Sequence, residues 1–440
     1  MKATSLLLAI LCLLSGSTIL RAQQDVRASQ SNELQLGPLQ RAAIESDPRF
    51  RQLQLQQAQS ALRLENLAAE KRPSIGVEGL AQYQSDVPTP PPFLPGGQPL
   101  FQPPKGTVDA SVRVDQQLLD PTIDSRKAVE QAQLQEGQAR VRSALFGLRQ
   151  DVNDAFFAAA LLQERSHALA ATIDELETRL TETNARVREG TALVADAAAI
   201  EATLLQRRQD ADAVRADRTT ALKRLSDLTG RAISEADVFV MPDLKSSVTE
   251  AMAAAKPVRA RPEYEQFART QARLASQQDA ASALERPRLS AFARAGVGRP
   301  GLNFISDTFE AYALGGFQLQ WKAWTWGSAG REREALAIQQ EIVAADEAAF
   351  TRSLDRALEG DRATIDRLER AVTLDDHIVE LREAVARTTE IRFRERAVTA
   401  SDYLDRSTDL LLARFALAGH RVELAQTSAR FLTTLGLEVR

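Results

Sequence analysis

The sequence contains two copies of one structural unit, and this duplication constrains the fold more than any other feature. Pro48 and Pro73 bracket a helix-like segment, and Pro262 and Pro287 bracket another of the same length, 214 residues further along. Further matches lie 206 residues apart: Val187-Arg188-Glu189 with Phe393-Arg394-Glu395, Asp196 with Asp402, and Leu-Thr-Gly ending at Gly230 with Thr-Leu-Gly ending at Gly436. Two halves that share such markers are predicted to fold alike.

Each copy has the same order of elements, namely a short helix, two strand-like segments around a loop, and a long stretch without proline. The proline-free stretches extend from Pro121 to Pro242 and from Pro300 to the last residue. We therefore expect a first repeat over 38–235, a linker over 236–246 and a second repeat over 247–440.

The proline-free stretches have the periodicity of coiled helices. Apolar or small residues recur at alternating steps of three and four, a 3.5-residue period that imposes a left-handed supercoil on packed helices. In the first repeat they are Leu145, Leu148, Val152, Ala155, Ala159, Leu162, Ser166, Leu169, Ile173, Leu176, Leu180, Thr183 and Val187; in the second they are Leu404, Thr408, Leu411, Phe415, Ala418, Val422, Ala425, Ala429 and Leu432. A structural coiled-coil scaffold would have the same pattern, so the helices alone leave the function open.

The strand-like segments favour a membrane β-barrel. Val108, Ala110, Val112 and Val114 alternate with Asp109, Ser111, Arg113 and Asp115, which gives one apolar and one polar face. In a barrel the apolar face meets lipid and the polar face lines the lumen. We predict strands over 74–84, 107–119, 288–297 and 308–321, each close to the ~9 to 11 residues that cross a bilayer as a tilted strand.

Four strands cannot close a barrel on their own, and open sheet edges do not occur in lipid. Since about eight strands still leave an interior filled by side chains, an open pore requires at least three subunits. The segment 85–106 holds eight of the 17 prolines and is predicted to be an exposed loop.

The N-terminus is predicted to be a secretory signal peptide over 1–22, followed by an extension over 23–37. Lys2 precedes an apolar run from Leu6 to Leu14, which is too short for a transmembrane helix, and small residues precede Ala22. The one cysteine, Cys12, lies in this run and lacks the small residues before it that a lipid-anchor site requires. The exported protein would therefore have no disulfide and no thiolate site.

Composition and motifs argue against an enzyme and against nucleic-acid binding. The formal net charge is -4, and Lys and Arg are interspersed with Asp and Glu. The three histidines lie on separate helical segments without metal-ligand spacing, and the sequence lacks a Gly-x-Ser-x-Gly elbow and a phosphate-binding Gly-x-x-x-x-Gly-Lys loop. We predict no catalytic residue, no cofactor and no metal site.

The duplication, Leu119-Asp120-Pro121 after the second strand, Arg261-Pro262-Glu263 at the start of the second repeat and the endings at Gly230 and Gly436 resemble the TolC family of outer-membrane efflux proteins. The resemblance implies a mainly helical fold with a small β part, in which a homotrimer forms a 12-stranded outer-membrane β-barrel and a periplasmic α-helical tunnel. It implies a passive exit duct of a tripartite efflux or type I secretion system. The implied partners are a periplasmic adaptor, an inner-membrane transporter and outer-membrane lipid of a diderm bacterium, with most of the chain in the periplasm.

The family turns between its paired helices at a Gly-x-x-x-x-x-Asp tip, and the first repeat has this motif from Gly190 to Asp196. The second repeat has Arg396 in place of the glycine, so we expect the tip near 394–402 to be shaped differently from that near 188–196. The resemblance assigns adaptor contact to the tip residues Gly190, Thr191, Ala192, Leu193, Arg396, Ala397, Val398 and Thr399.

The carboxylates just above the tips narrow the closed entrance in the family, and Asp196, Asp402 and Asp405 match those positions. In a trimer each would form a ring of three like charges. Aspartates near a helix start also serve as caps, so a capping role stays open beside the gating role. Phe393 and Val398 replace a tyrosine and an arginine of the family's closing network, so the tethers must differ.

All three tryptophans, Trp321, Trp324 and Trp326, follow the fourth strand, where an aromatic girdle at the membrane interface would lie; core packing is the alternative. The alternative function is that of a periplasmic coiled-coil adaptor or scaffold protein. An adaptor would have one helical hairpin between small barrel domains, whereas this chain has two equivalent hairpins and two strand pairs.

Overall fold

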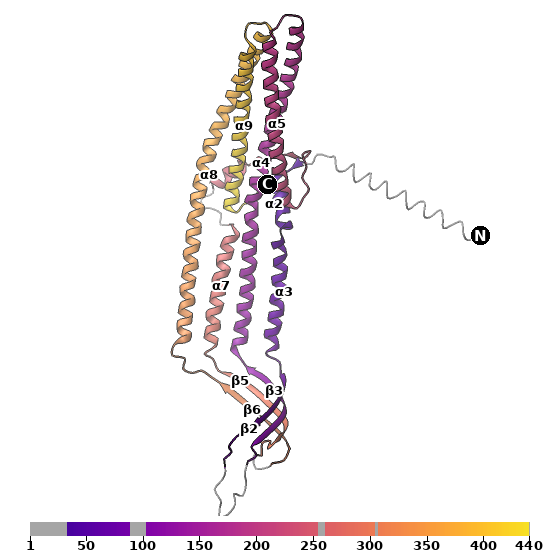
Figure 1. Ribbon diagram of the computed structural model, residues 1–440. Helices are drawn as coiled ribbons and strands as arrows, with labels where there is room; N and C mark the ends of the chain where they lie inside the picture. Colours follow the sequence, from indigo (N-terminus) through magenta and orange to yellow (C-terminus); the bar gives the residue numbers. More distant parts are fainter. Residues whose placement is uncertain (1–32, 89–102, 254–259, 304–306, 440) are drawn as a thin grey trace, which may run out of the picture. The chain divides into compact units, whose positions relative to one another are not determined.

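A computed structural model describes residues 33–88, 103–253, 260–303 and 307–439. The predicted signal peptide over 1–22 lies outside them, as does most of the extension over 23–37. The predicted fold class, mainly helical with four strands in one sheet, is confirmed (Figure 1). The first repeat was expected over 38–235, and its elements begin at residue 33: β1 (Glu33–Leu34), α2 (Leu36–Ser46), α3 (Pro48–Ala69), β2 (Ser74–Tyr83), β3 (Gly106–Leu119), α4 (Pro121–Arg188) and α5 (Val194–Thr229).

The second repeat has the same elements in the same order. They are β4 (Val238–Phe239), α6 (Lys245–Ala253), α7 (Pro262–Ala283), β5 (Arg288–Arg299), β6 (Glu310–Gln320), α8 (Ser328–Arg394) and α9 (Ala400–Leu435). The segment 236–246, expected as a linker, contains β4 and the start of α6, and β4 pairs in parallel with β1. The equivalence of the halves thus includes short elements that the sequence patterns did not reveal.

The chain divides into two compact units, and this division cuts across the repeats. The first unit comprises the described residues within 1–51, 141–264 and 349–440, and the second comprises those within 52–140 and 265–348. Each unit takes its parts from both repeats. The long helices α4 and α8 each contribute one segment to either unit, so neither repeat is a compact domain by itself.

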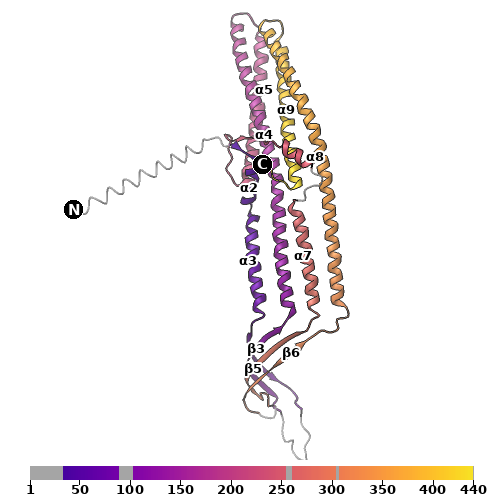
Figure 2. The ribbon, with the colours of Figure 1, turned by 180° about the vertical axis from the view of Figure 1, so that it is seen from behind.

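The first unit is a bundle built around the predicted heptad positions. Every seam residue from Leu145 to Val187 on α4, and from Leu404 to Leu432 on α9, is buried or half-buried. The paired helices run side by side in both views (Figures 1 and 2). The aromatic rings of Phe156, Phe157 and Phe239 lie in the core of the bundle, where the Phe156 ring meets each of the other two edge to face. Burial of the 3.5-residue stripe is thus what holds these helices together.

One polar network lies inside this core. The side-chain amide of Gln40 on α2 donates to Oδ1 of Asn153 on α4 at 2.6 Å, and Asn153 Nδ2 donates to the hydroxyl of Thr433 on α9 at 3.3 Å. Asn153 is fully buried. A buried asparagine at a helix seam favours the one register in which its partners meet it, so this network aligns helices of both repeats.

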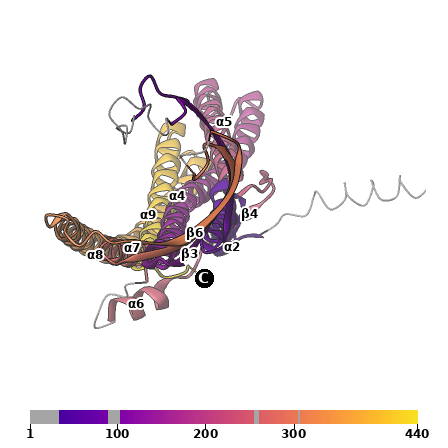
Figure 3. The ribbon, with the colours of Figure 1, turned by 90° about the horizontal axis from the view of Figure 1, so that it is seen from below.

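The second unit contains a four-stranded antiparallel sheet in the order β2-β3-β5-β6. The pairing of β3 with β5 joins the strand pair of the first repeat to that of the second, with Val112 opposite Ala295. The sheet is strongly curved (Figure 3). β2 and β6 are its edges, and the described strands leave their outer backbone groups unpaired.

In the described ranges, no helix has both the length and the hydropathy that a membrane-spanning helix needs.

The buried network gives a testable prediction for stability. We expect Asn153→Ala to destabilise the protein by about 1–3 kcal/mol, because the substitution leaves the buried Gln40 amide without its partner and removes one of the two hydrogen bonds of the Thr433 hydroxyl. Thermal unfolding of the purified protein followed by circular dichroism measures the change. Asn184→Ala, at an exposed position of the same helix, is the matched control and should leave the midpoint within the error. Equal effects of the two substitutions would contradict a specific role for the network.

Candidate functional site

The sheet of the second unit has one apolar and one polar face. The register aligns alternate residues of all four strands, so that Val77, Val112, Ala295 and Ala313 lie on one face. The side chains of this face are largely exposed, with 84% exposure at Val77 and 76% at Phe317. A continuous exposed apolar surface of this kind marks contact with lipid or with another protein.

The polar face is the concave one. Tyr312 on β6 reaches across β5, and its hydroxyl donates to Asp109 Oδ2 on β3 at 2.5 Å. Strands two apart are separated by about 10 Å in a flat sheet, and curvature toward the polar side chains shortens the gap that they span. Arg294 on β5 similarly reaches toward Glu78 on β2 across β3. The apolar face is therefore convex, as in the wall of a barrel.

The three tryptophans lie in the segment between β6 and α8. Their exposed fractions are 60% for Trp321, 76% for Trp324 and 81% for Trp326. Trp324 and Trp326 meet edge to face at 5.9 Å, and the indole N–H of Trp321 donates to the carbonyl of Glu285 at 2.9 Å. These rings are not core residues of the described chain, and a place at the membrane interface stays a prediction.

The two tip turns have the same backbone conformation, and the expectation that the second would differ is wrong. Gly190 has φ 69° and Arg396 has φ 63°. In the first turn the N–H of Gly190 donates to Val187 O and that of Thr191 to Arg186 O; the second turn repeats these bonds 206 residues later, from Arg396 to Phe393 and from Ala397 to Arg392. This is the Schellman ending of a helix. The hydrogen bonds of the turn hold Arg396 in a conformation that ordinarily favours glycine.

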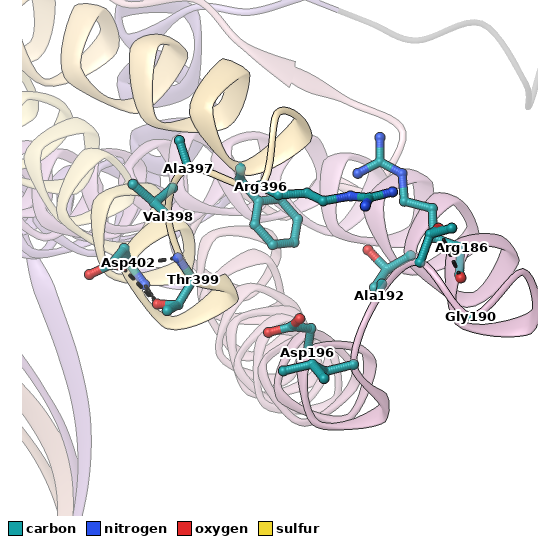
Figure 4. A pocket seen from close by; sticks show the side chains of 13 residues that line it. Arg186, Gly190, Ala192, Asp196, Arg396, Ala397, Val398, Thr399 and Asp402 are labelled. Atoms are coloured by element: carbon teal, nitrogen blue, oxygen red, sulfur yellow. Dashed lines mark hydrogen bonds between the residues drawn. The ribbon is translucent and has the colours of Figure 1, made fainter.

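The structure brings the two tips together around one pocket of about 540 Å³ (Figure 4). All eight predicted tip residues line it, as do Asp196 and Asp402; Arg186, Thr183 and Phe393 complete the lining. Asp405 does not line the pocket and is exposed on the first turns of α9. The pocket combines apolar walls with two arginines and two aspartates, a surface suited to bind a protein segment.

Asp402 is a helix cap. Its carboxylate accepts hydrogen bonds from the backbone N–H and the hydroxyl of Thr399, while Thr399 Oγ1 accepts from the N–H of Asp402, which completes a capping box at the start of α9 (Figure 4). The hydrogen bond from the Thr399 side chain, followed by that from its backbone, lowers the pKa of Asp402.

Asp196 has the equivalent position at the start of α5, but the capping residue there is Leu193, which makes no side-chain hydrogen bond. The two aspartates therefore have different chemical settings in equivalent turns.

The sequence patterns did not predict a buried cluster next to the pocket, formed by Tyr403, Phe393, Glu175 and Arg179. The ring of Tyr403 on α9 stacks on Phe393 of α8 at 5.4 Å between centroids, and its hydroxyl donates to Glu175 of α4 at 2.7 Å. Burial, and then the Glu175 carboxylate, raise the pKa of Tyr403. Arg179 of α4, also buried, pairs with Glu182 and with Glu390 of α8.

This cluster links α4, α8 and α9 of one subunit near the tips. The sequence contained one usable signal for it, the (i, i+4) pair Glu175 and Arg179 on the edge of the heptad seam. Its partners are more than 200 residues away, and periodicity does not identify them.

The shared tip geometry predicts opposite effects of glycine at the two turns. Arg396→Gly should stabilise its turn by about 1 kcal/mol, because the positive φ penalises a side chain. Gly190→Ala should destabilise the other turn by a similar amount, since a Cβ at position 190 meets no atom within 4 Å and the cost is backbone strain alone. Hydrogen exchange of the tip peptides measures both changes. If Arg396→Gly left the protection of its tip at the wild-type level, the result would contradict the positive φ at residue 396.

The capping box predicts that the start of α9 depends on pH. The pKa of Asp402 is lower in the folded protein, so its stabilising contribution is present above the ordinary aspartate pKa of about 3.9 and is lost as pH falls through the lower folded value. Hydrogen exchange of residues 399–405, corrected for intrinsic rates, should rise in that acid range. Thr399→Ala should remove most of this dependence. The equivalent segment of α5 is the internal control, and an identical acid response there would contradict the capping role.

Comparisons with known proteins agree with this geometry. Residues 38–231 match the family model described as outer membrane efflux protein. Comparison with the curated proteins finds no match.

Several solved structures share the fold over almost the whole chain. CusC has a TM-score of 0.70 at 13% identity, with 92% of each chain covered. The outer membrane protein VceC of Vibrio cholerae has a TM-score of 0.66 at 12% identity and covers 92% of this chain and 97% of its own. The MtrE outer membrane channel of Neisseria gonorrhoeae has a TM-score of 0.64 at 16% identity, with 92% and 89% covered.

The family match lies in the first repeat. The shared fold also includes the second repeat, which has the same elements in the same order as the first. Over residues 38–231 the chain thus matches the outer membrane efflux protein family, and over almost its whole length it has the fold of these solved structures.

Proposed function

We propose that the chain is one subunit of a trimeric outer-membrane efflux channel, through which substrates delivered by an inner-membrane transporter leave the cell. The observation that carries the proposal is the curved sheet, with its exposed apolar convex face, its polar concave face and its two unpaired edges. A lipid-facing sheet has to close, because unpaired edge groups are too costly in hydrocarbon. Three copies of a four-stranded sheet give twelve strands, enough to enclose an open lumen.

The long helices would form the periplasmic part of the duct. Each subunit supplies two helical hairpins, α4 with α5 and α8 with α9, in which buried heptad seams hold the paired helices together. Exposed apolar residues remain on α8, among them Leu374, Ile378, Leu381 and Val385 at helical spacing. Their burial against a neighbouring subunit is the simplest reason for such a stripe on a solvated helix. Most of each chain would then lie between the two membranes of a diderm bacterium.

The tip pocket is the proposed docking place of a periplasmic adaptor, which would connect the channel to the inner-membrane transporter. The pocket joins Gly190, Thr191, Ala192 and Leu193 of one hairpin to Arg396, Ala397, Val398 and Thr399 of the other. The Tyr403 and Arg179 contacts behind it tie the helices that carry both tips. A partner would therefore meet a preformed surface, which lowers the entropic cost of binding.

The aspartates at the tips are the proposed entrance gate. In a trimer, Asp196, Asp402 and Asp405 would each occur three times around one axis, and such rings attract cations. Asp402 is held by its cap, whereas the exposed Asp405 makes no contact to the capping box. We therefore assign Asp405 the larger share of cation attraction.

An adaptor or scaffold role is the alternative. A periplasmic coiled-coil protein would use the helices and the tips, but it has no need of a curved sheet that exposes valine and phenylalanine on its convex face. The sheet thus favours the channel.

Single-channel recording of the purified protein in a planar bilayer tests the proposal. We expect discrete cation-selective openings that divalent cations block from the tip side. Asp405→Ala should weaken the block by roughly tenfold, equivalent to about 1.4 kcal/mol of lost attraction. Thr399→Ala, which keeps every charge and releases Asp402 from its cap, is the matched comparison and should retain or strengthen the block. A well-folded oligomer that neither inserts nor conducts would overturn the channel and favour the adaptor.

A further inference from the structure

Two arginines of the polar face stand directly opposite each other. Arg113 on β3 and Arg294 on β5 are register partners, and like charges at such positions destabilise a sheet. Each turns away from the other along the strands. Arg113 pairs with Asp115 and Arg294 with Asp109, so that β3 presents a carboxylate on either side of the arginine pair.

Arg294 is clamped against the sheet by several groups. Its Nη2 donates to Asp109 Oδ1 at 2.6 Å and its Nε to the Ser111 hydroxyl at 2.8 Å. The guanidinium lies over the ring of Tyr312, 5.8 Å from its centroid, and the Tyr312 hydroxyl donates to the second oxygen of Asp109. The Asp109 side chain is only 12% exposed. Both its oxygens are thus used to hold neighbours in place.

Arg113 is held in the same manner. Its Nε donates to Asp115 Oδ2 at 2.8 Å and its Nη2 to Oδ1 at 3.0 Å, a bidentate pair. Its guanidinium lies 5.5 Å from the centre of the Phe292 ring. Neither arginine extends freely from the wall, because each has both a carboxylate and an aromatic face as a partner.

Two glycines of β5 make room for these contacts. A Cβ at position 298 would lie 2.8 Å from Asp109 Oδ2, and a Cβ at position 296 would lie 2.6 Å from Ser111 Cβ. Both positions are on the polar face, opposite Asp109 and Ser111. Because both residues are glycines, no side chain covers β5 on the polar face at these positions. Tyr312 and Arg294 can therefore reach β3 across this face.

We propose that these residues form a charge belt that sets the ion selectivity of the barrel lumen. The belt comprises Glu78, Asp109, Arg113, Asp115 and Arg294, with Phe292 and Tyr312 as supports. It has three carboxylates and two guanidinium groups, hence one excess negative charge in each subunit. The inference rests on the proposed channel function, in which the concave face lines the pore and the belt occurs three times.

The belt would act in two ways. Its excess negative charge gives a weak preference for cations. The hydrogen bonds from Arg113 to Asp115 and from Arg294 to Asp109 keep both arginine side chains against the wall, so that wide solutes of either charge still pass. Asp109 is the key positioning residue, because its loss would remove a negative charge and free Arg294 to extend into the lumen. Loss of Arg294 would instead leave Asp109 unbalanced.

The test is the permeability ratio of K⁺ to Cl⁻, from the reversal potential of single channels in a KCl gradient. Asp109→Asn should shift the ratio toward anions and Arg294→Gln toward cations. Each shift should be about twofold or more, because wall charges act over about one Debye length, ~10 Å at 0.1 M salt. The double variant restores the net charge and should return the ratio close to that of the wild type. Arg294→Lys, which keeps the charge, should also stay close to it.

Glu78→Gln is the variant least expected to misfold. Glu78 is 45% exposed, and its carboxylate lies 3.8 Å from Arg294, too far for a hydrogen bond. This variant should fold normally and lose part of the cation preference. Conducting variants with an unchanged ratio, or with shifts in the same direction for Asp109→Asn and Arg294→Gln, would overturn the belt and leave the channel intact. A folded wild type without conductance would instead overturn the channel function itself.

Discussion

The pairing of β3 with β5 is the interaction on which the rest of the structure depends. Each repeat supplies one strand pair, and two strands alone are marginally stable. The β3–β5 ladder joins the pairs into one curved sheet, aligns the apolar residues of all four strands on one face and brings Arg113 opposite Arg294. It also leaves β2 and β6 as edges, from which the need for further subunits follows.

The same duplication acts differently in the helical bundle of the first unit. There the repeats meet through side chains: the buried Asn153 network aligns helices of both repeats, and the Tyr403 and Arg179 cluster ties α4 to α8 and α9. The two tips have equivalent backbones but different side chains at their caps. Thr399 caps one helix and engages Asp402, whereas Leu193 at the other leaves Asp196 without that partner. Equivalent turns thus hold their carboxylates differently.

Much of the fold was predictable because it follows from local periodicity. A 3.5-residue period over six heptads requires long paired helices, and alternation from Val108 to Val114 requires a two-faced strand. The predicted strand over 74–84 is observed over Ser74–Tyr83, and the helices end within the predicted tip segments. The elements β1 and β4 were not predicted, since a two-residue strand has no periodicity of its own.

The sequence by itself determined the duplication, the long coiled helices and the alternating strands, because each follows from the spacing of residues along the chain. The positions of the tip residues followed from the resemblance of 190–196 to a family motif. Only the tertiary structure decided that Arg396 adopts the conformation of Gly190, because the hydrogen bonds of the helix end outweigh the preference of the residue. It likewise decided that Asp402 is capped and that Asp109, Arg294 and Tyr312 meet on one concave face. Those contacts join residues up to 203 positions apart, and their geometry depends on strand register and curvature, which no local pattern specifies.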